Sequence, residues 1–368
     1  MSSQLLWYIP NQARPGHRGD DVVAGHNSLE NLTAQARALE EHGWDGALLG
    51  TGWGRPDTFT VAAALAARTT TFQPLIAIRP GYWSPAHFAS AAATLDHLTD
   101  GRVLVNVVSG EDHPAAYGDV PAGREARYAR TAEFMRIVRR LWTEEDVTYC
   151  GEHFHVTGST VQPRPAARAA RRHPPLYFGG ASTAAERVAA TEADVQLFWG
   201  EPLGDVAERI ERLRRLADRL GRELPPLEFG LRVTTVVRDT AAQAWADAEA
   251  RVAAMAQGRV ARDVNWTAAA GQQRLLGLAA RGEVLDRNLY TAPGRYGGAG
   301  AATTWLVGSA ADVAASLRDY QALGITHFIL SDTPYLPELA RQGDLLLPLL
   351  RPRPGPTAPA PAGTCRSR

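Results

Sequence analysis

Short apolar runs alternate with amphipathic helical patterns along most of the 368-residue chain. Apolar runs bounded by Gly, Pro, Asn and Asp are typical of buried strands, and the longer periodic stretches between them predict helices. We expect eight strands, at residues 5–9, 46–49, 72–78, 103–108, 176–178, 194–198, 227–237 and 328–330, and an additional hairpin at 147–156. Eight strands alternating with helices predict an α/β fold of the (β/α)8 TIM-barrel type rather than an open doubly wound sheet.

Two stretches depart from this alternation. Residues 258–304 form a long insertion between strands seven and eight, with Gly- and Ala-rich pieces. An insertion of this length is either an active-site lid or a set of extra helices packed outside the barrel. Residues 351–368 are rich in Pro and Ala and predict a disordered tail. Residues 1–350 are therefore expected to form a single barrel domain that carries the insertion.

Composition narrows the class of protein. The chain has 39 basic and 39 acidic side chains, so a formal net charge of zero gives no indication of a nucleic-acid or membrane partner. Its two cysteines, Cys150 and Cys365, lack metal-ligand spacing and fit a reducing cytoplasm. No segment approaches the roughly 20 apolar residues of a membrane span. We expect a soluble cytoplasmic protein.

Candidate chemistry begins where the strand at 103–108 ends. Asn106, Ser109, Asp112 and His113 offer an amide, a hydroxyl, a carboxylate and an imidazole within a few residues. Loops after the strands of a barrel usually carry its active site. The alternative is an ordinary loop in which Ser109 or Asp112 caps the next helix.

The turn at residues 179–183, Gly-Gly-Ala-Ser-Thr, follows the strand at 176–178 and opens a helix. Free N–H groups and the helix dipole at such a turn can hold a phosphate, although a tight turn with a serine cap has the same pattern. The GxxxxGK[ST] and GxGxxG motifs are absent, which argues against a nucleotide triphosphatase or a dinucleotide-binding fold. A nucleophile elbow and a zinc-spaced histidine pair are absent too, and we expect no metal site.

A series of motifs then points to one family. In chain order they are LWYIPNQ, ATLDHLTDGRVLVNVVSGED, ARYARTAEF, PPLYFGGAS, LFWGEP, FGLRVTTVVRD, GGAG and LGITHFILSDTPYLPELARQGDLLLPLL. Over residues 5–350 the chain resembles the bacterial luciferase-like flavin monooxygenases, most closely the alkanesulfonate monooxygenases. The resemblance implies reduced FMN delivered by a separate flavin reductase, O2 activated on the flavin, and cleavage of a C–S bond. It also implies a homodimer or homotetramer.

The resemblance assigns roles to individual residues. Asn106 and Ser109 match positions beside the flavin ring, and Tyr128 a position near the flavin phosphate. The cofactor-binding turn comprises Gly180, Ala181, Ser182 and Thr183. Trp199 and Arg232 match a substrate-pocket tryptophan and an arginine at the end of the seventh strand, so the catalytic candidates are Arg232, Trp199 and Asn106. The ordinary alternatives are a helix-packing Tyr128, a core Trp199 and a surface ion pair of Arg232.

Five positions depart from the family pattern. Arg55 replaces a cysteine, Thr234 a histidine and Gln12 a histidine; Tyr296, beside Arg295, replaces the arginine of the insertion, and Thr333 a tyrosine. The flavin-side motifs are largely kept, which indicates the same cofactor and a different substrate. We expect Gln12, Arg55, Arg295 and Tyr296 to line the substrate site together with Trp199 and Arg232.

These inferences leave three functional hypotheses. The leading one is a two-component FMNH2-dependent monooxygenase that uses O2 on a small organosulfur compound or a specialised metabolite. A deazaflavin (F420)-dependent oxidoreductase shares the barrel, and a non-catalytic flavin-binding barrel is the third. Arg55, Arg79, Arg232 and Arg295 all fall at the same end of the predicted barrel, so we expect an anionic or strongly polar substrate.

Overall fold

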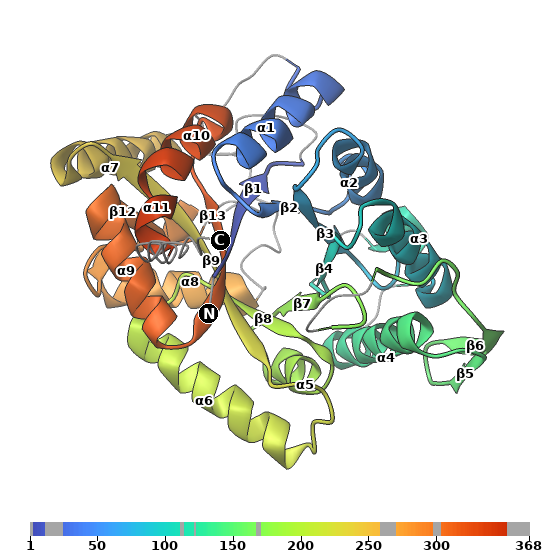
Figure 1. Cartoon of the computed structure of the whole chain (residues 1–368). Helices are drawn as coiled ribbons and strands as arrows, with labels where there is room; N and C mark the ends of the chain where they lie inside the picture. The colour runs from blue at the N-terminus through green and yellow to red at the C-terminus, as the bar shows by residue number, and fades with distance from the viewer. Residues whose placement is uncertain are drawn as a thin grey trace, which may run out of the picture.

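Eight parallel strands close into a ring at the centre of the computed structural model (Figure 1). They are β1 (Gln4–Ile9), β2 (Gly46–Leu49), β3 (Gln73–Ile78), β4 (Leu104–Val107), β7 (Leu176–Gly179), β8 (Val195–Trp199), β9 (Glu228–Arg238) and β13 (Ile325–Ser331). Each pairs with the next, and β9 pairs with both β8 and β13, which closes the ring. The predicted (β/α)8 barrel is confirmed. The structure describes residues 3–11, 25–110, 114–120, 123–166, 171–257, 270–296 and 303–351.

Helices surround the ring (Figure 1). They are α1 (Leu29–Glu41), α2 (Thr58–Ala66), α3 (Pro85–Leu98), α4 (Arg124–Thr143), α5 (Thr183–Glu192), α6 (Leu203–Arg219), α7 (Ala241–Gln257), α9 (Ala310–Ala322), α10 (Tyr335–Leu345) and α11 (Leu347–Leu350). The predicted hairpin is present as β5 (Val147–Cys150) and β6 (His155–Ser159), outside the ring. None of the helices in the described ranges is long and apolar enough to cross a membrane.

Side chains of the strands divide into two apolar clusters. The cluster inside the ring contains Leu6, Tyr8, Leu75, Leu104, Tyr177, Val195, Leu197 and Ile329. The larger cluster, which includes Trp7, Phe88, Phe134, Phe198 and Phe328, lies between the strands and the helices. Because side chains alternate along a strand, this division also fixes the direction of polar residues. Asn106, Trp199 and Ser331 each lie two residues after a member of the inner cluster and therefore point into the barrel. Arg232 is the register partner of Trp199 and lies over the inner Tyr8 ring, so it points the same way.

The strand β9 is 11 residues long and extends beyond the ring. Its first half belongs to the ring, while Thr234 and the residues after it pair with β12 (Trp305–Ser309). β12 continues through β11 (Leu289–Tyr290) to β10 (Val284–Leu285). The sequence pattern did not predict these short strands.

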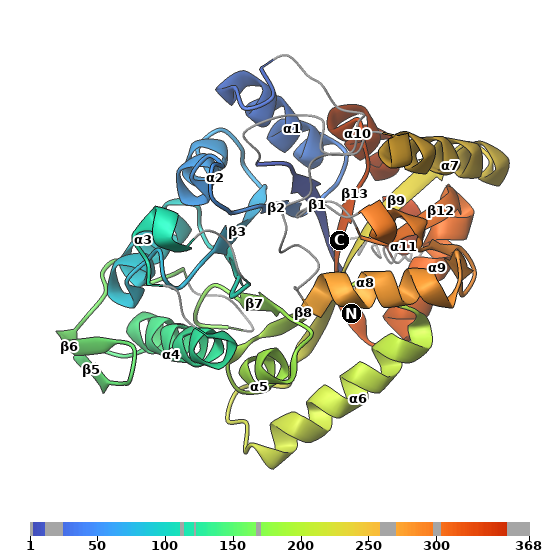
Figure 2. The ribbon, with the colours of Figure 1, turned by 180° about the vertical axis from the view of Figure 1, so that it is seen from behind.

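The described part of the insertion also contains the helix α8 (Ala270–Arg281) and the 3-10 helix η3 (Ala292–Tyr296). In Figure 2, α8 lies beside α6. Arg281 pairs with Asp205 of α6 at 2.6 Å, and the Asp286 carboxylate accepts the Leu203 N–H at 2.8 Å. The lid role remains a prediction, since residues 258–269 and 297–302 lie outside the described ranges, as do Gln12, Asp112, His113 and the tail from residue 352.

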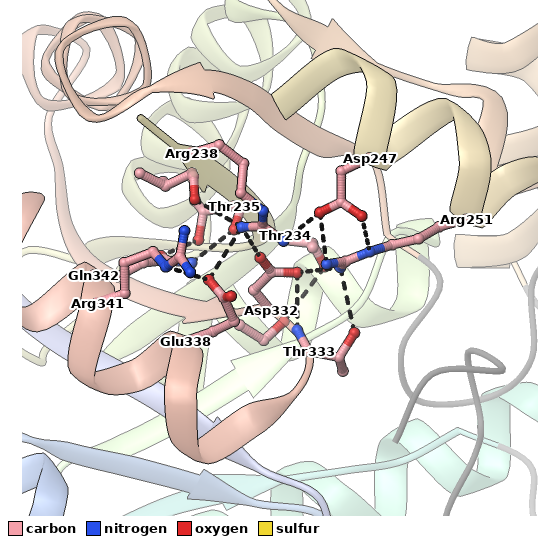
Figure 3. A network of polar contacts seen from close by, with 12 residues as sticks. Thr234, Thr235, Arg238, Asp247, Arg251, Asp332, Thr333, Glu338, Arg341 and Gln342 are labelled. Carbon is pink, nitrogen blue, oxygen red and sulfur yellow. Dashed lines mark hydrogen bonds and ion pairs between the residues drawn. The ribbon is translucent and has the colours of Figure 1, made fainter. Parts of the chain in front are cut away.

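A buried ionic network joins the elements on either side of the insertion (Figure 3). Asp332, at the end of β13, is fully buried and pairs with Arg251 of α7 at 2.6 Å and with Arg238 of β9 at 3.1 Å. Arg238 also pairs with Asp247 and, at 3.1 Å, with Glu338 of α10. Burial and the nearby charge of Asp332 raise the pKa of Glu338 to about 7. The network therefore fixes α7 and α10 against the two strand ends.

The close pairing of β2 with β3 leads to a stability prediction. A Cβ atom on Gly46 would lie 1.9 Å from the carbonyl oxygen of Gln73, a backbone atom that cannot move alone. Gly46→Ala should lower the free energy of unfolding by about 3 kcal/mol or more, because one of the two strands must shift. Gly204→Ala in α6 is the matched control, since nothing lies within 4 Å of its added Cβ. Urea denaturation of both variants checks this, and equal midpoints would contradict it.

Glu338 gives a pH prediction. Its pKa is raised from 4.5 to about 7 by folding, so the folded chain binds more protons than the unfolded chain between these values. The free energy of unfolding should fall as the pH rises through this window, by on the order of 2 kcal/mol. Glu338→Gln should remove that slope, whereas Glu208→Gln, at an exposed pair with Arg212, should keep it. Denaturation curves at pH 5 and pH 8 distinguish the variants; an unchanged slope in Glu338→Gln would refute the assignment.

Candidate active site

The C-terminal end of the barrel gathers several of the predicted site residues. Arg232 and Trp199 are register partners on β9 and β8, and Asn106 lies on β4, which only β7 separates from β8. Arg232 is 6% exposed, whereas Trp199 is 41% exposed at its strand end. Trp199 is thus a rim residue rather than a core residue, and Arg232 is not a surface ion-pair residue.

Arg232 is held in place by a tyrosine and a serine. Its guanidinium carbon lies 4.7 Å from the centre of the Tyr8 ring, which is a cation–π contact. Its Nη1 donates to the Ser331 hydroxyl at 3.0 Å, and that hydroxyl lies 3.3 Å from the Thr234 hydroxyl. These contacts fix a cationic group inside the barrel mouth, next to Thr234.

Arg55 approaches the same tyrosine from the loop after β2. A Cβ atom on Gly50 would lie 3.1 Å from Arg55 Nη1 and 3.3 Å from the Tyr8 hydroxyl, so both groups occupy the space that Gly50 leaves. Asn11, fully buried after β1, holds this loop by donating to the carbonyl oxygens of Gly50 at 3.0 Å and Pro56 at 2.8 Å. Tyr8 therefore lies near two arginines that are far apart in the sequence.

Asn106 presents a buried acceptor on the inner face of β4. Asn106 is 8% exposed, and its Oδ1 has no hydrogen-bond partner among the described residues. Nearby, the Ser109 hydroxyl lies 2.6 Å from that of Thr131, which donates its single proton to the Arg127 carbonyl at 2.8 Å. Ser109 must then be the donor to Thr131. A buried amide oxygen without a partner is costly unless a ligand N–H reaches it.

The turn after β7 has the geometry of a helix N-terminus. Ser182 is the N-cap of α5, and its hydroxyl accepts the Ala185 N–H at 3.2 Å. The N–H groups of Thr183 and Ala184 precede any possible intrahelical acceptor. A Cβ on Gly180 would lie 2.4 Å from that of Ala185, so glycine is needed for the turn to approach the helix. The serine cap is present, and it is compatible with an anion at the remaining N–H groups.

The remaining predicted residues lie elsewhere or have packing contacts. Tyr128 packs edge-on against Phe178, with ring centres 6.3 Å apart. Arg295 is exposed and donates to the Ala279 carbonyl of α8 at 3.1 Å, while Tyr296 packs on the apolar cluster between α7 and β12. No described contact joins Arg295 or Tyr296 to Arg232. Arg79, after β3, donates to the Gly110 carbonyl.

Sequence reasoning missed Tyr8 and Asn11. The alternation in β1 could have placed Tyr8 inside the barrel beside Leu6, but no local signal pairs it with an arginine on the seventh strand of the ring. In the described ranges, the structure shows no group of His, Cys, Asp and Glu side chains suited to a metal ion. The chemistry offered by this end of the barrel is therefore cationic, aromatic and hydrogen-bonding.

Comparison with known proteins agrees with this architecture. A riboflavin lyase, solved with modified FMN and riboflavin, is 19% identical, with a TM-score of 0.73 over 95% of this chain and 91% of its own. The EDTA monooxygenase from Chelativorans sp. BNC1 is 18% identical, with a TM-score of 0.73 over 94% and 93%. An F420-dependent secondary alcohol dehydrogenase, in complex with an F420-acetone adduct, is 17% identical, with a TM-score of 0.68 over 96% and 100%. At these identities the similarity shows a shared fold.

The family assignment rests on the sequence of the chain itself. Residues 4–327 match the luciferase-like monooxygenase family, which covers β1 to the start of β13 and so nearly the whole barrel. The family expected from the motifs is confirmed. The protein belongs to the luciferase-like monooxygenases and is an oxidoreductase of that family.

Proposed function

We propose that the protein is the oxygenase of a two-component system, which uses reduced FMN from a separate flavin reductase and O2 to oxidise a small anionic organosulfur compound or specialised metabolite. The observation that carries this proposal is the buried Asn106 Oδ1, an acceptor without a described partner inside the barrel mouth. A reduced flavin ring carries N–H groups that could satisfy it. The turn at 180–183 on the neighbouring strand β7 provides N–H groups for a phosphate.

The space around these groups supports a fit to flavin. Gly179 points into the barrel and is exposed, and a Cβ there would meet nothing closer than 3.9 Å. Asn106 would bind the ring with Ser109 nearby, and Tyr128 would lie beside the chain that leads to the phosphate. Ala181, Ser182 and Thr183 would hold the phosphate itself.

The chain's own residues would bind and orient the substrate. When bound, reduced FMN supplies the electrons with which one atom of O2 enters the substrate and the other leaves as water. Arg232, fixed by Tyr8 and Ser331, can pair with a sulfonate, sulfinate or carboxylate, and Arg55 adds positive charge near the Tyr8 hydroxyl. Trp199 would cover the substrate at the rim. The insertion would exclude water from the site.

Two other functions remain distinguishable. The first is an F420-dependent oxidoreductase, which would bind its cofactor at the same end of the barrel. This hypothesis is supported by the fold that the chain shares with an F420-dependent secondary alcohol dehydrogenase. A flavin-binding barrel without catalysis would bind FMN without product formation. The monooxygenase hypothesis is preferred because residues 4–327 match a family described as luciferase-like monooxygenase.

The function predicts a dependence on a second protein. The purified chain should bind dithionite-reduced FMN more tightly than oxidised FMN and should not oxidise NADPH alone, since it carries no dinucleotide motif. Adding a generic flavin reductase should produce oxygen consumption coupled to product. Steady NADPH oxidation without reductase would reject the two-component scheme, turnover of F420 would support the alternative, and binding without product would support the non-catalytic barrel.

Arg232 gives the substrate prediction. Arg232→Ala should lower kcat/KM for an anionic substrate at least tenfold, about 1.4 kcal/mol, and Arg232→Lys should restore little because an ammonium cannot bind in a bidentate way. Arg287→Ala, at an exposed pair with Asp319, is the control and should have no effect. The assay is sulfite release from C1 to C10 alkanesulfonates beside a wider panel of anionic compounds. We expect slow release from the simple alkanesulfonates, because the family's cysteine and histidine are replaced.

Turnover of simple alkanesulfonates at roughly 1 s⁻¹ or faster would show that the five departures are tolerated. A neutral, apolar substrate that is used efficiently and is insensitive to Arg232→Ala would refute the role of the arginine.

A further inference from the structure

A layer of buried polar side chains lies beneath the turn after β7. It contains Gln196 of β8, which is fully buried, and Arg209 of α6, which is 3% exposed. Gln196 Nε2 donates to the Gly180 carbonyl oxygen at 3.2 Å, and Arg209 Nη2 donates to the same oxygen at 3.0 Å. Two donors on one carbonyl oxygen occupy both of its lone pairs.

This arrangement fixes the direction of the next N–H group. A trans peptide is planar, so its N–H points opposite to its carbonyl oxygen. With the Gly180 carbonyl directed into the protein, the Ala181 N–H is directed away from Arg209 and Gln196. The N–H groups of Thr183 and Ala184 at the start of α5 lack intrahelical acceptors as well.

We propose that Gln196 and Arg209 are positioning residues that preset this turn for the phosphate group of the flavin, so that the protein selects FMN over riboflavin. The inference rests on the proposed function and deepens it, because it assigns phosphate selectivity to residues that do not touch the cofactor. A peptide that is already oriented loses less entropy on binding than one that must rotate.

Arg209 is itself held rigidly. Its Nη1 pairs with Glu201 at 2.6 Å, its Nε approaches Glu186 at 3.4 Å, and its guanidinium carbon lies 4.6 Å from the centre of the Phe198 ring. Glu201 follows β8 and is buried, and it also pairs with Arg274 of the insertion at 3.4 Å. The Glu201 carboxylate thus joins Arg209 to Arg274 of α8. The insertion is therefore in contact with the buried polar layer beneath the turn after β7.

The experiment compares two flavins that differ only in the phosphate. Dithionite-reduced FMN and riboflavin are titrated anaerobically into the full-length protein, followed by tryptophan fluorescence. Gln196→Met and Arg209→Lys should each weaken FMN binding about tenfold and change riboflavin binding less than about twofold. Ser182→Asp, which places a carboxylate in the turn, is the positive control and should weaken FMN binding at least fivefold.

Arg212→Met is the matched structural control. Arg212 lies on the same helix as Arg209, and both arginines contact Glu186, Arg212 at 2.8 Å. Unlike Arg209, Arg212 makes no hydrogen bond to Gly180 among the described residues. This variant should alter the melting temperature without altering the ratio of the two flavin affinities. Melting curves of all variants separate loss of folding from loss of selectivity.

The outcomes are distinct. An unchanged ratio in Gln196→Met and Arg209→Lys, with an unaltered protein that prefers FMN, would overturn the positioning role and leave the proposed function standing. An equal loss for both flavins would show a merely structural layer and overturn the role as well. If the unaltered protein binds both flavins equally, the phosphate turn is wrong, and the positioning role is overturned with it.

Discussion

The pairing of β9 with both β8 and β13 is the interaction on which the rest of the structure depends, because it closes the ring. Closure requires β8, β9 and β13 to approach closely, and Gly230 permits it: a Cβ there would lie 2.6 Å from Leu197. Two residues further along β9, where the ring opens, Arg232 points into the mouth. The same strand then continues beyond the ring to pair with β12, so one strand closes the barrel, carries the candidate substrate residue and supports the insertion.

The buried ion pairs of this barrel hold its elements in position and contribute little to its net stability. Taking a carboxylate and a guanidinium out of water costs several kcal/mol, which their mutual attraction only roughly offsets. The Arg238–Asp332–Arg251 network and the Arg209–Glu201 pair therefore contribute mainly by fixing positions. Each one joins elements next to the insertion to the C-terminal ends of the strands, where the candidate site lies. The opposite end of the ring has its own chain of contacts, from Tyr177 through His327 to Glu228.

Some parts of the candidate site are formed by consecutive residues, and others by residues that lie far apart in the sequence. The turn after β7 is local: a glycine pair, a serine cap and a helix follow one another in the chain, so the sequence pattern was sufficient to place it. Asn106 was found for a similar reason, since a polar residue inside a β-branched run is unusual. The support of the turn is not local. Gln196 and Arg209 appear in the sequence as one polar residue in a strand and one arginine among several in α6, and only packing brings both to the same carbonyl oxygen.

The eight strands followed from the amino-acid sequence alone, because strand periods and turn residues act over short distances. The family followed from the series of motifs. The motif at the seventh strand also singled out Arg232. Only the tertiary structure decided that Tyr8 stacks on Arg232, that Arg55 reaches the same tyrosine, and that Arg295 instead packs on α8. These contacts join strands and loops separated by tens to hundreds of residues. They depend on the stagger with which the ring closes, and no local pattern of hydrophobic and polar residues encodes that stagger.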